Sequence, residues 1–267
     1  MKLSILTATY NRGKYLSRLY ESIVNNKKTS GIEIEWIIID DGSSDNTKEI
    51  VENFILENKF NIKYIYQENS GKMAAINRGM KDVTGELIVD CDSDDYFSLY
   101  AFKIIEENDL RLLNENEIYA MCFLKQDEFG NISGKKFEHD YIKSTMFDLY
   151  FRQEIEGEKI LVFNASIRKK FKHELENNEK FVTEARMYHK MDKDYKVLCI
   201  NEVVEIGEYI EDGYTKNILN TFKSSPNGYY KYFKEILQNG LRGATLKKKI
   251  YVIKHLLYFW ILKHIRF

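Results

Sequence analysis

The fold is decided by the stretch Glu86-Leu-Ile-Val-Asp-Cys-Asp92-Ser93-Asp94-Asp95-Tyr-Phe97, in which an apolar run leads directly into an acidic cluster. Four carboxylates stand within six residues: Asp90, Asp92, Asp94 and Asp95. Because like charges this close repel one another, the cluster favours a divalent cation among them. A solvated acidic loop is the alternative, and the stretches upstream decide between the two.

The composition sets broad limits on the class of protein. A chain of 267 residues fits one large domain, or a domain with an appendage, and 44% hydrophobic residues can form a sizeable core. Forty basic and 41 acidic residues leave a net charge of -1, which gives no global indication of nucleic-acid binding. The first residues already form a strand-like run, which is too short for a secretory signal.

Cysteine and histidine show no ligand spacing. The cysteines Cys91, Cys122 and Cys199 are few and far apart, so we expect them to be reduced and buried in a cytoplasmic protein. The five histidines are expected on the surface or in the tail: His139, His173, His189, His255 and His264.

Strand and helix patterns alternate three times in the first ninety residues. We expect strands at 2–9, 32–39, 62–66 and 87–89, and helices at 15–26, at 47–57 and after Gly71. This order predicts an open α/β sheet with mainly parallel strands, whose ligands bind beyond the carboxyl ends of the strands. The polar clusters all fall there, at 10–12, 40–45, 68–72 and 92–95.

The rest of the chain is less regular. We expect helices at 99–114 and 184–191, strands at 118–125, 160–167 and 197–200, and a turn at 127–131, while 137–152 is ambiguous. After Gly213 the composition shifts, which predicts a main domain at 1–216 and a C-terminal helical extension at 217–267.

Four motifs follow one another in the first hundred residues: Ser4-Ile-Leu-Thr-Ala-Thr-Tyr-Asn11, Asp40-Asp-Gly-Ser-Ser-Asp-Asn-Thr47, Asn69-Ser-Gly-Lys-Met-Ala-Ala-Ile-Asn-Arg-Gly79 and Asp92-Ser-Asp-Asp95. In this order and spacing they resemble the serial motifs of family 2 glycosyltransferases of the bacterial cell-surface polysaccharide type. The resemblance implies the GT-A fold, a Rossmann-like sheet flanked by helices. Gly157-Glu-Lys159 and Glu208-Tyr-Ile-Glu-Asp-Gly-Tyr-Thr215 resemble a bacterial branch of that family more loosely.

The resemblance implies a nucleotide-diphosphate sugar as donor, with a UDP-sugar favoured. The residues assigned to its binding are Thr9, Tyr10, Asn11, Arg12, Asp41, Lys72, Arg78, Asp92 and Ser93. Tyr10 can stack on the base, Asp41 takes the family's role of accepting a hydrogen bond from the uracil imide, and Lys72 stands near a helix start, where phosphates bind. Helix capping by Asp41 and a solvated Lys72 are the alternatives.

Asp92 and Asp94 form an Asp-X-Asp element whose hard oxygen ligands suit Mg²⁺ or Mn²⁺. By family analogy Asp94 is the direct ligand and Asp92 contacts ribose or metal-bound water. Such a metal stabilises the departing nucleoside diphosphate. We expect Asp95 to contact the residues that bind the metal rather than the metal itself. We expect Asp90 to be structural, because strand alternation can point its side chain away from the site.

Family members transfer the sugar with inversion of configuration at its anomeric carbon. This direct displacement requires a general base that takes the proton of the acceptor hydroxyl. The family places this base in a later acidic motif, often Glu-Asp, and this sequence has no clear Glu-Asp pair there. Phe181-Val-Thr-Glu184-Ala-Arg resembles the form of the bacterial branch, with Glu184 as base. Asp192 and Asp194 are the competitors, and Glu184 as the mere start of a helix is the remaining alternative.

The tail at 246–267 is basic and apolar together. Its apolar run at 250–262 is interrupted by Lys254 and His255, and is shorter than the ~20 residues that a bilayer span needs. Lysines beside aromatic and aliphatic residues favour a helix in the membrane interface. A helix packed on the domain, or on a second subunit of a homo-oligomer, is the alternative.

The resemblance implies an inverting, metal-dependent hexosyltransferase that uses a glycan or lipid-linked acceptor. We expect it in the cytoplasm, peripheral at the inner face of the membrane, with no nucleic-acid partner. A nucleotidyltransferase would need a glycine-rich, basic loop after the first strand, which Thr7-Ala-Thr-Tyr-Asn-Arg12 lacks. A non-catalytic nucleotide-sugar-binding or scaffold protein would have a broken Asp-X-Asp element or no base.

Overall fold

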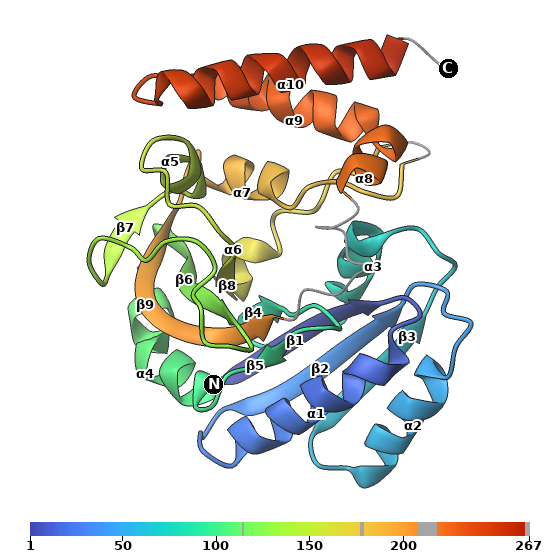
Figure 1. Cartoon of the computed structure of the whole chain (residues 1–267). Coiled ribbons are helices and arrows are strands. Elements are labelled where there is room, and N and C mark those ends of the chain that lie inside the picture. The colour runs from blue at the N-terminus through green and yellow to red at the C-terminus, as the bar shows by residue number, and fades with distance from the viewer. Residues whose placement is uncertain (114, 177–178, 208–217, 265–267) are drawn as a thin grey trace.

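The apolar runs of the first ninety residues form parallel strands that each lead into the next helix (Figure 1). The computed structural model describes residues 1–113, 115–176, 179–207 and 218–264. In it β1 (Lys2–Thr9), β2 (Glu33–Asp40), β3 (Asn61–Tyr66) and β4 (Leu87–Asp90) lie in the order β3-β2-β1-β4, all parallel. They alternate with α1 (Gly13–Lys27), α2 (Thr47–Glu57) and α3 (Lys72–Gly79), as predicted. The carboxyl ends of these strands therefore meet at one edge.

The second half extends the same sheet with mixed strand directions. The added strands are β5 (Tyr96–Phe97), β6 (Ile118–Asp127), β7 (Ile142–Ser144), β8 (Lys159–Asn164) and β9 (Lys196–Gly207). Within the described residues the sheet has nine strands, in the order β3-β2-β1-β4-β8-β6-β9-β5 with β7 beside β9. The expectation of a mainly parallel sheet is confirmed: β6 and β9 pair parallel to each other, whereas β8 is antiparallel to both β4 and β6.

Helices cover both faces of the sheet. Leu3 and Ile5 of β1 pack with α1, α2 and α4 (Ala101–Leu113), whereas Leu6 faces the opposite core. That second core includes side chains of α3, α5 (Met146–Phe151), α6 (Ala165–Arg168) and α7 (Ala185–Met191). A sheet buried on both faces explains why β1 and β2 are continuous apolar runs in the sequence. The predicted strand at 160–167 consists of a strand, β8, followed by the short helix α6. The ambiguous segment 137–152 contains β7 and α5.

A buried carboxylate, Glu35 of β2, connects this strand to β1 and to the residues just before β4. Its oxygens accept hydrogen bonds from Ser4 of β1 and from Thr84 and Gly85 before β4, and Lys2 Nζ lies 3.0 Å away. Burial alone would raise its pKa, but the hydrogen bonds from Ser4 and Thr84 override this and lower the pKa of Glu35 to about 2. The ionised form of Glu35 is thus part of the fold.

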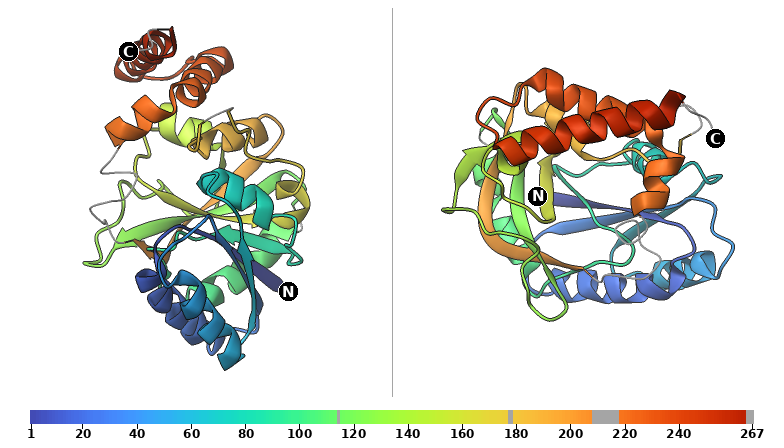
Figure 2. Two further views of the ribbon diagram at one scale, coloured as in Figure 1. Left: turned by 90° about the vertical axis from the view of Figure 1, so that its right-hand side faces the viewer. Right: turned by 45° about the horizontal axis from the view of Figure 1, so that its top comes forward.

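The C-terminal extension forms a helical layer beyond α5 and α7 (Figure 2). It consists of α8 (Ile218–Ser224), α9 (Pro226–Asn239) and α10 (Leu246–His264). The helical extension expected at 217–267 is interrupted at Ser225, because Pro226, at the start of α9, cannot continue the hydrogen bonding of α8. The predicted domain boundary after 216, and the motif at 208–215, lie outside the described residues.

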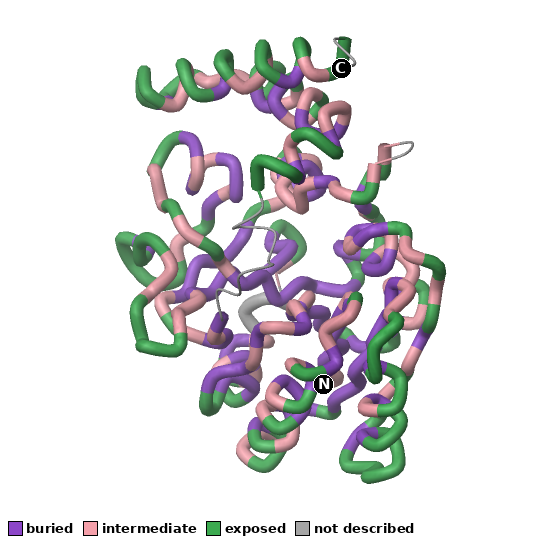
Figure 3. Tube along the Cα trace, turned by 45° about the vertical axis from the view of Figure 1, so that its right-hand side comes forward, coloured by how far each residue is buried: buried purple, intermediate pink, exposed green. Residues whose placement is uncertain are grey.

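A third apolar core joins this layer to the main domain. Phe147 and Phe151 of α5 pack there with Phe233 of α9 and with Val252 and Phe259 of α10. The inner face of α10 packs mainly on α9 within this layer, while much of its outer face is exposed (Figure 3). No helix in the described part of the chain is long and apolar enough to cross a membrane.

We predict that Glu35→Gln lowers the free energy of unfolding by about 3 kcal/mol at neutral pH, the value of a pKa held near 2. A carboxylate with a depressed pKa stabilises the fold above its unfolded pKa, so the difference from wild type should shrink as pH falls from about 5 towards 2. Urea unfolding at several pH values measures this. Glu33→Gln, at an exposed partner of Lys2, is the control and should cost less than about 1 kcal/mol. An equal loss for Glu35→Gln at pH 7 and pH 3 would contradict the assignment.

Candidate active site

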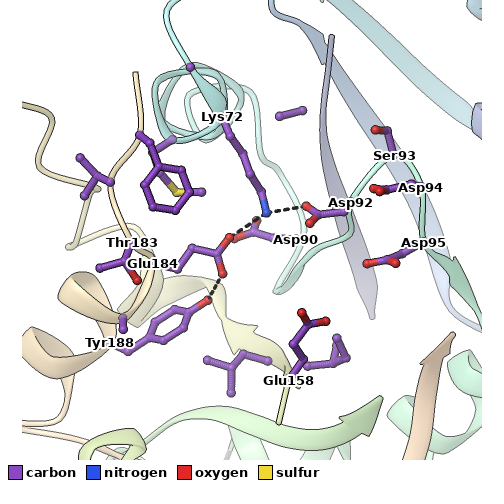
Figure 4. A pocket seen from close by; sticks show the side chains of 18 of the residues that line it. Lys72, Asp90, Asp92, Ser93, Asp94, Asp95, Glu158, Thr183, Glu184 and Tyr188 are labelled. Atoms are coloured by element: carbon purple, nitrogen blue, oxygen red, sulfur yellow. Dashed lines mark hydrogen bonds and ion pairs between the residues drawn. The ribbon is translucent and has the colours of Figure 1, made fainter. Parts of the chain in front are cut away.

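A cavity of about 1070 Å³ lies at the carboxyl ends of β1, β2 and β4. All four sequence motifs line it, through Thr9, Tyr10, Asn11, Arg12, Asp41, Lys72, Asp92, Ser93 and Asp94. Its opposite wall comes from the second half of the chain and includes Glu158, Glu184 and Tyr188 (Figure 4). The sheet edge predicted from the sequence is therefore the edge at which the cavity forms.

Asp41 shapes the loop that leads to Lys72. Its Oδ1 accepts hydrogen bonds from the Ser70 amide and from Gln67 Nε2, and its Oδ2 accepts one from the Gly71 amide. Gly71 has φ +95°, and a Cβ there would lie 1.9 Å from the carbonyl oxygen of Lys180, so only glycine fits. Among the described residues, Asp41 makes no hydrogen bond with the start of α2; there the amide and hydroxyl of Thr47 donate hydrogen bonds to Asp45 instead.

Asn11 joins the loops that follow β1 and β2. It has φ +52°, a left-handed conformation that asparagine tolerates better than most residues. Its amide donates to Ser43 Oγ, and its Oδ1 accepts from the Ser44 amide. The neighbouring Tyr10 is half exposed at the cavity, and the buried hydroxyl of Thr9 has no hydrogen-bond partner among the residues that the structure describes.

Lys72 links the two halves of the cavity. Its Nζ lies 2.6 Å from Asp92 Oδ1 and 2.8 Å from Glu184 Oε1 (Figure 4). Burial alone would lower the pKa of Lys72, but Asp92 and Glu184 hold it well above its usual value. The lysine is therefore charged and faces the acidic motif, so it is not the solvated lysine of the alternative interpretation.

Glu184 stands at the start of α7 and also accepts a hydrogen bond from the Tyr188 hydroxyl, at 3.1 Å. Burial opposes its ionisation, but Lys72 overrides burial and lowers the pKa of Glu184 to about 2. The competitors lie outside the cavity. Asp192 accepts hydrogen bonds from the amides of Met146 and Phe147 at the start of α5, and Asp194 is exposed. Of the three carboxylates considered as base, Glu184 is the one that lines the cavity.

Asp92 and Asp94 fit a divalent cation that is shared with a substrate. The described residues contain no group of three His, Cys, Asp or Glu side chains arranged to hold a metal ion. Mg²⁺ needs no such group, because it binds through one or two carboxylates together with water and substrate phosphates. Burial, and then the charge of Asp92, raise the pKa of Asp94. A cation would relieve this repulsion.

Lys125 of β6 gathers three further carboxylates and was missed in the sequence. Its Nζ lies 2.6 Å from Asp95, 2.9 Å from Glu158 and 3.5 Å from Glu205 of β9. Burial disfavours its charge, but Glu205, Asp95 and Glu158 hold the pKa of Lys125 well above its usual value. Asp95 thus supports the acidic loop through Lys125. Glu158 belongs to a motif that the sequence singled out without assigning it a role.

Three expectations need correction. Asp90, the last residue of β4, lines the cavity 4.0 Å from the buried Arg168, because strand alternation places it on the same side as Ile88, the side covered by α3, α6 and α7. Arg78 lies outside the cavity and pairs with Asp82 at 2.6 Å, because it faces another side of α3 from Lys72.

His173 and His189 are buried rather than on the surface, and burial lowers the pKa of these histidines to about 3 and 4. The three cysteines are buried and free, as expected.

Comparison with known proteins identifies the family. The family model described as glycosyl transferase family 2 matches residues 4–106. A protein of Mycoplasma genitalium named uncharacterized glycosyltransferase MG060 is 30% identical over 243 residues, covering 88% of this chain and 71% of its own length. The chain belongs to glycosyltransferase family 2.

Two further proteins extend the comparison of this family 2 member. The Campylobacter jejuni GalNAc(5)-diNAcBac-PP-undecaprenol beta-1,3-glucosyltransferase is 29% identical over 188 residues, covering 67% of this chain and 57% of its own length. The crystal structure of a Staphylococcus aureus TarS fragment in complex with UDP superposes with a TM-score of 0.65 at 21% identity, covering 97% of this chain and 71% of that one. The fold is the GT-A fold, as the resemblance implied.

We predict that Lys125→Met costs about 3–5 kcal/mol of stability, because it leaves Asp95 and Glu205 buried without a cation. Burial already raises the pKa of both carboxyls, so acid should protonate them and narrow the gap to wild type between pH 7 and pH 5. Thermal unfolding at both pH values measures this. Lys48→Met, at an exposed pair with Glu52, is the control and should cost less than about 0.5 kcal/mol. Equal losses for the two variants would contradict the account.

Proposed function

We propose that this chain is an inverting, metal-dependent hexosyltransferase that moves a sugar from a UDP-sugar to a hydroxyl of a glycan or lipid-linked acceptor. The observation that carries the proposal is the meeting of Asp92, Lys72 and Glu184 around one cavity. The reaction needs carboxylates for a metal, a positive charge for phosphates and a base for the acceptor proton. This arrangement supplies all three.

The nucleotide end of the donor fits the loops after β1 and β2. Tyr10 offers a half-exposed ring, and the hydroxyl of Thr9 is available for a polar contact. Asp41 already accepts three hydrogen bonds, and a carboxylate has about four acceptor sites, so room remains for the uracil imide. Asn11 acts on the donor indirectly by holding these loops together.

Asp94 would hold Mg²⁺ or Mn²⁺, with Asp92 beside it. When bound, the metal supplies Lewis-acid stabilisation of the leaving nucleoside diphosphate. The residues of this chain do the rest: Lys72 offers its ammonium group to the diphosphate, and the start of α3 adds backbone N–H groups that favour an anion.

Glu184 would accept the proton of the acceptor hydroxyl as that oxygen attacks the anomeric carbon. Its pKa of about 2 in the free protein makes it a weak base while Lys72 is its partner. An incoming diphosphate competes with Glu184 for Lys72, and loss of that partner raises the pKa of Glu184. Donor binding therefore prepares the base.

The acceptor would approach from the wall built by the second half of the chain. Aromatic side chains line that part of the cavity: Tyr150, Phe151, Phe181, Tyr188 and Tyr232. Such rings suit the apolar faces of sugars as well as lipid. The Campylobacter relative, whose name contains PP-undecaprenol, supports a lipid-linked acceptor. Such an acceptor would place the reaction in cell-surface glycan synthesis at the inner face of the membrane.

Two rival functions fit the site less well. A non-catalytic scaffold does not need Glu184 opposite an intact Asp-X-Asp element, and a nucleotidyltransferase does not need a base on the acceptor wall. Neither has a specific observation in its favour.

A panel of nucleotide sugars, assayed for released nucleoside diphosphate with and without Mn²⁺ and acceptor, tests the activity. We predict metal-dependent release with at least one UDP-sugar, and a loss of about 100-fold or more for Asp94→Asn, because a metal-bound carboxylate contributes several kcal/mol. Asp194→Asn, at an exposed aspartate outside the cavity, should keep wild-type rates. The proposal fails if no donor shows metal-dependent turnover or binding.

We predict that Glu184→Gln lowers kcat by roughly 10²–10⁴-fold, because the amide cannot take the acceptor proton. The same variant should bind UDP at least as tightly as wild type, since Glu184 no longer competes with the diphosphate for Lys72. Steady-state kinetics and calorimetry with UDP measure the two effects, with Asp194→Asn as control. Full transfer by Glu184→Gln would remove it as base, and a large loss of UDP affinity would refute the competition for Lys72.

A further inference from the structure

The helix α10 carries large apolar side chains on two opposite faces. One face packs on α9 through Val252 and Phe259, which are fully buried. The other face carries Leu246, Ile250, Ile253, Leu257, Trp260 and Ile261, which are between 43% and 73% exposed. Their spacing of three and four residues places them in one stripe along the helix. Single exposed apolar residues are ordinary, but a continuous stripe of six marks an interaction surface.

The charge beside this stripe is of one sign. Residues 246–264 contain five lysines and no acidic residue. At 100° per residue, Lys249 and Lys254 fall at the two borders of the stripe. Lys248 instead turns towards the main domain and pairs with Glu156 at 3.1 Å. The surface therefore combines an apolar stripe with positively charged borders and has an aromatic residue, Trp260, near its end.

We propose that this face of α10 lies on a membrane surface that contains anionic lipids, with the helix parallel to the bilayer. The apolar stripe enters the boundary of the acyl chains while the bordering lysines contact lipid phosphates. The helix cannot span the bilayer, because Lys254 lies at its middle. The proposal concerns a surface apart from the cavity, so it stands or falls separately from the proposed transferase activity.

A second copy of the chain is the main rival occupant. Two α10 stripes packed against each other would bring lysine borders close to lysine borders, and α10 offers no acidic side chain to neutralise them. An anionic lipid surface supplies that charge. Charge complementarity therefore favours lipid over self-association.

Tryptophan fluorescence separates these occupants, because the chain has two tryptophans in different settings. Trp36 is fully buried in the main core, whereas Trp260 is 49% exposed on the stripe. We expect vesicles of phosphatidylcholine with about one-third phosphatidylglycerol to shift the emission to shorter wavelength and to bind the protein at least tenfold more tightly than phosphatidylcholine alone. Trp260→Phe should abolish the shift and keep binding in vesicle sedimentation.

Substitutions test which side chains bind the vesicles. Leu257→Glu should reduce vesicle binding more than tenfold, and Lys249→Gln with Lys254→Gln should reduce it about tenfold or more on anionic vesicles. Leu56→Glu, at an 80% exposed leucine of α2, should leave it unchanged. Circular dichroism and transferase assay without lipid confirm that each variant folds. The proposal is overturned if anionic vesicles do not bind the protein, or if the shift appears without lipid as light scattering reports a dimer.

Discussion

Two carboxylates from distant parts of the chain, Asp92 and Glu184, share the ammonium group of Lys72. The position of this group depends on the loop before α3, which Asp41 holds and which glycine at 71 permits. It also depends on β4, which carries Asp92 to the sheet edge, and on α7, which brings Glu184 across the cavity. The first hundred residues and the second half of the chain thus meet at one charged contact.

Charge balance explains the rest of the site. The acidic loop would be unstable beside Glu158 and Glu205 without buried cations, and Lys125 supplies one at its rear. Lys72 supplies another at its front, where it remains open to the cavity. Lys125 is enclosed by carboxylates and stabilises the fold. Lys72, in contrast, can exchange a carboxylate partner for a ligand. This division lets a single acidic stretch serve both folding and the proposed chemistry.

Much of this arrangement could be predicted from sequence, because parallel strands present their carboxyl ends at one edge. Tyr10, Asp41 and Asp92 each follow such a strand, so their side chains are expected at the same edge of the sheet. Lys125 and Glu205 could not be found in this way, since they lie on paired strands of the mixed half, where no motif spacing indicates the partner. Arg78 lies outside the cavity, because six residues along a helix from Lys72 place it about 120° away.

A crystal structure of the chain with UDP and Mn²⁺, with anomalous diffraction recorded for manganese, tests the central claim most directly. The account predicts manganese at Asp94, uracil between Tyr10 and Asp41, and Lys72 moved from Glu184 to the diphosphate. Nucleotide bound elsewhere, or bound with the contact between Lys72 and Glu184 unchanged, would contradict it.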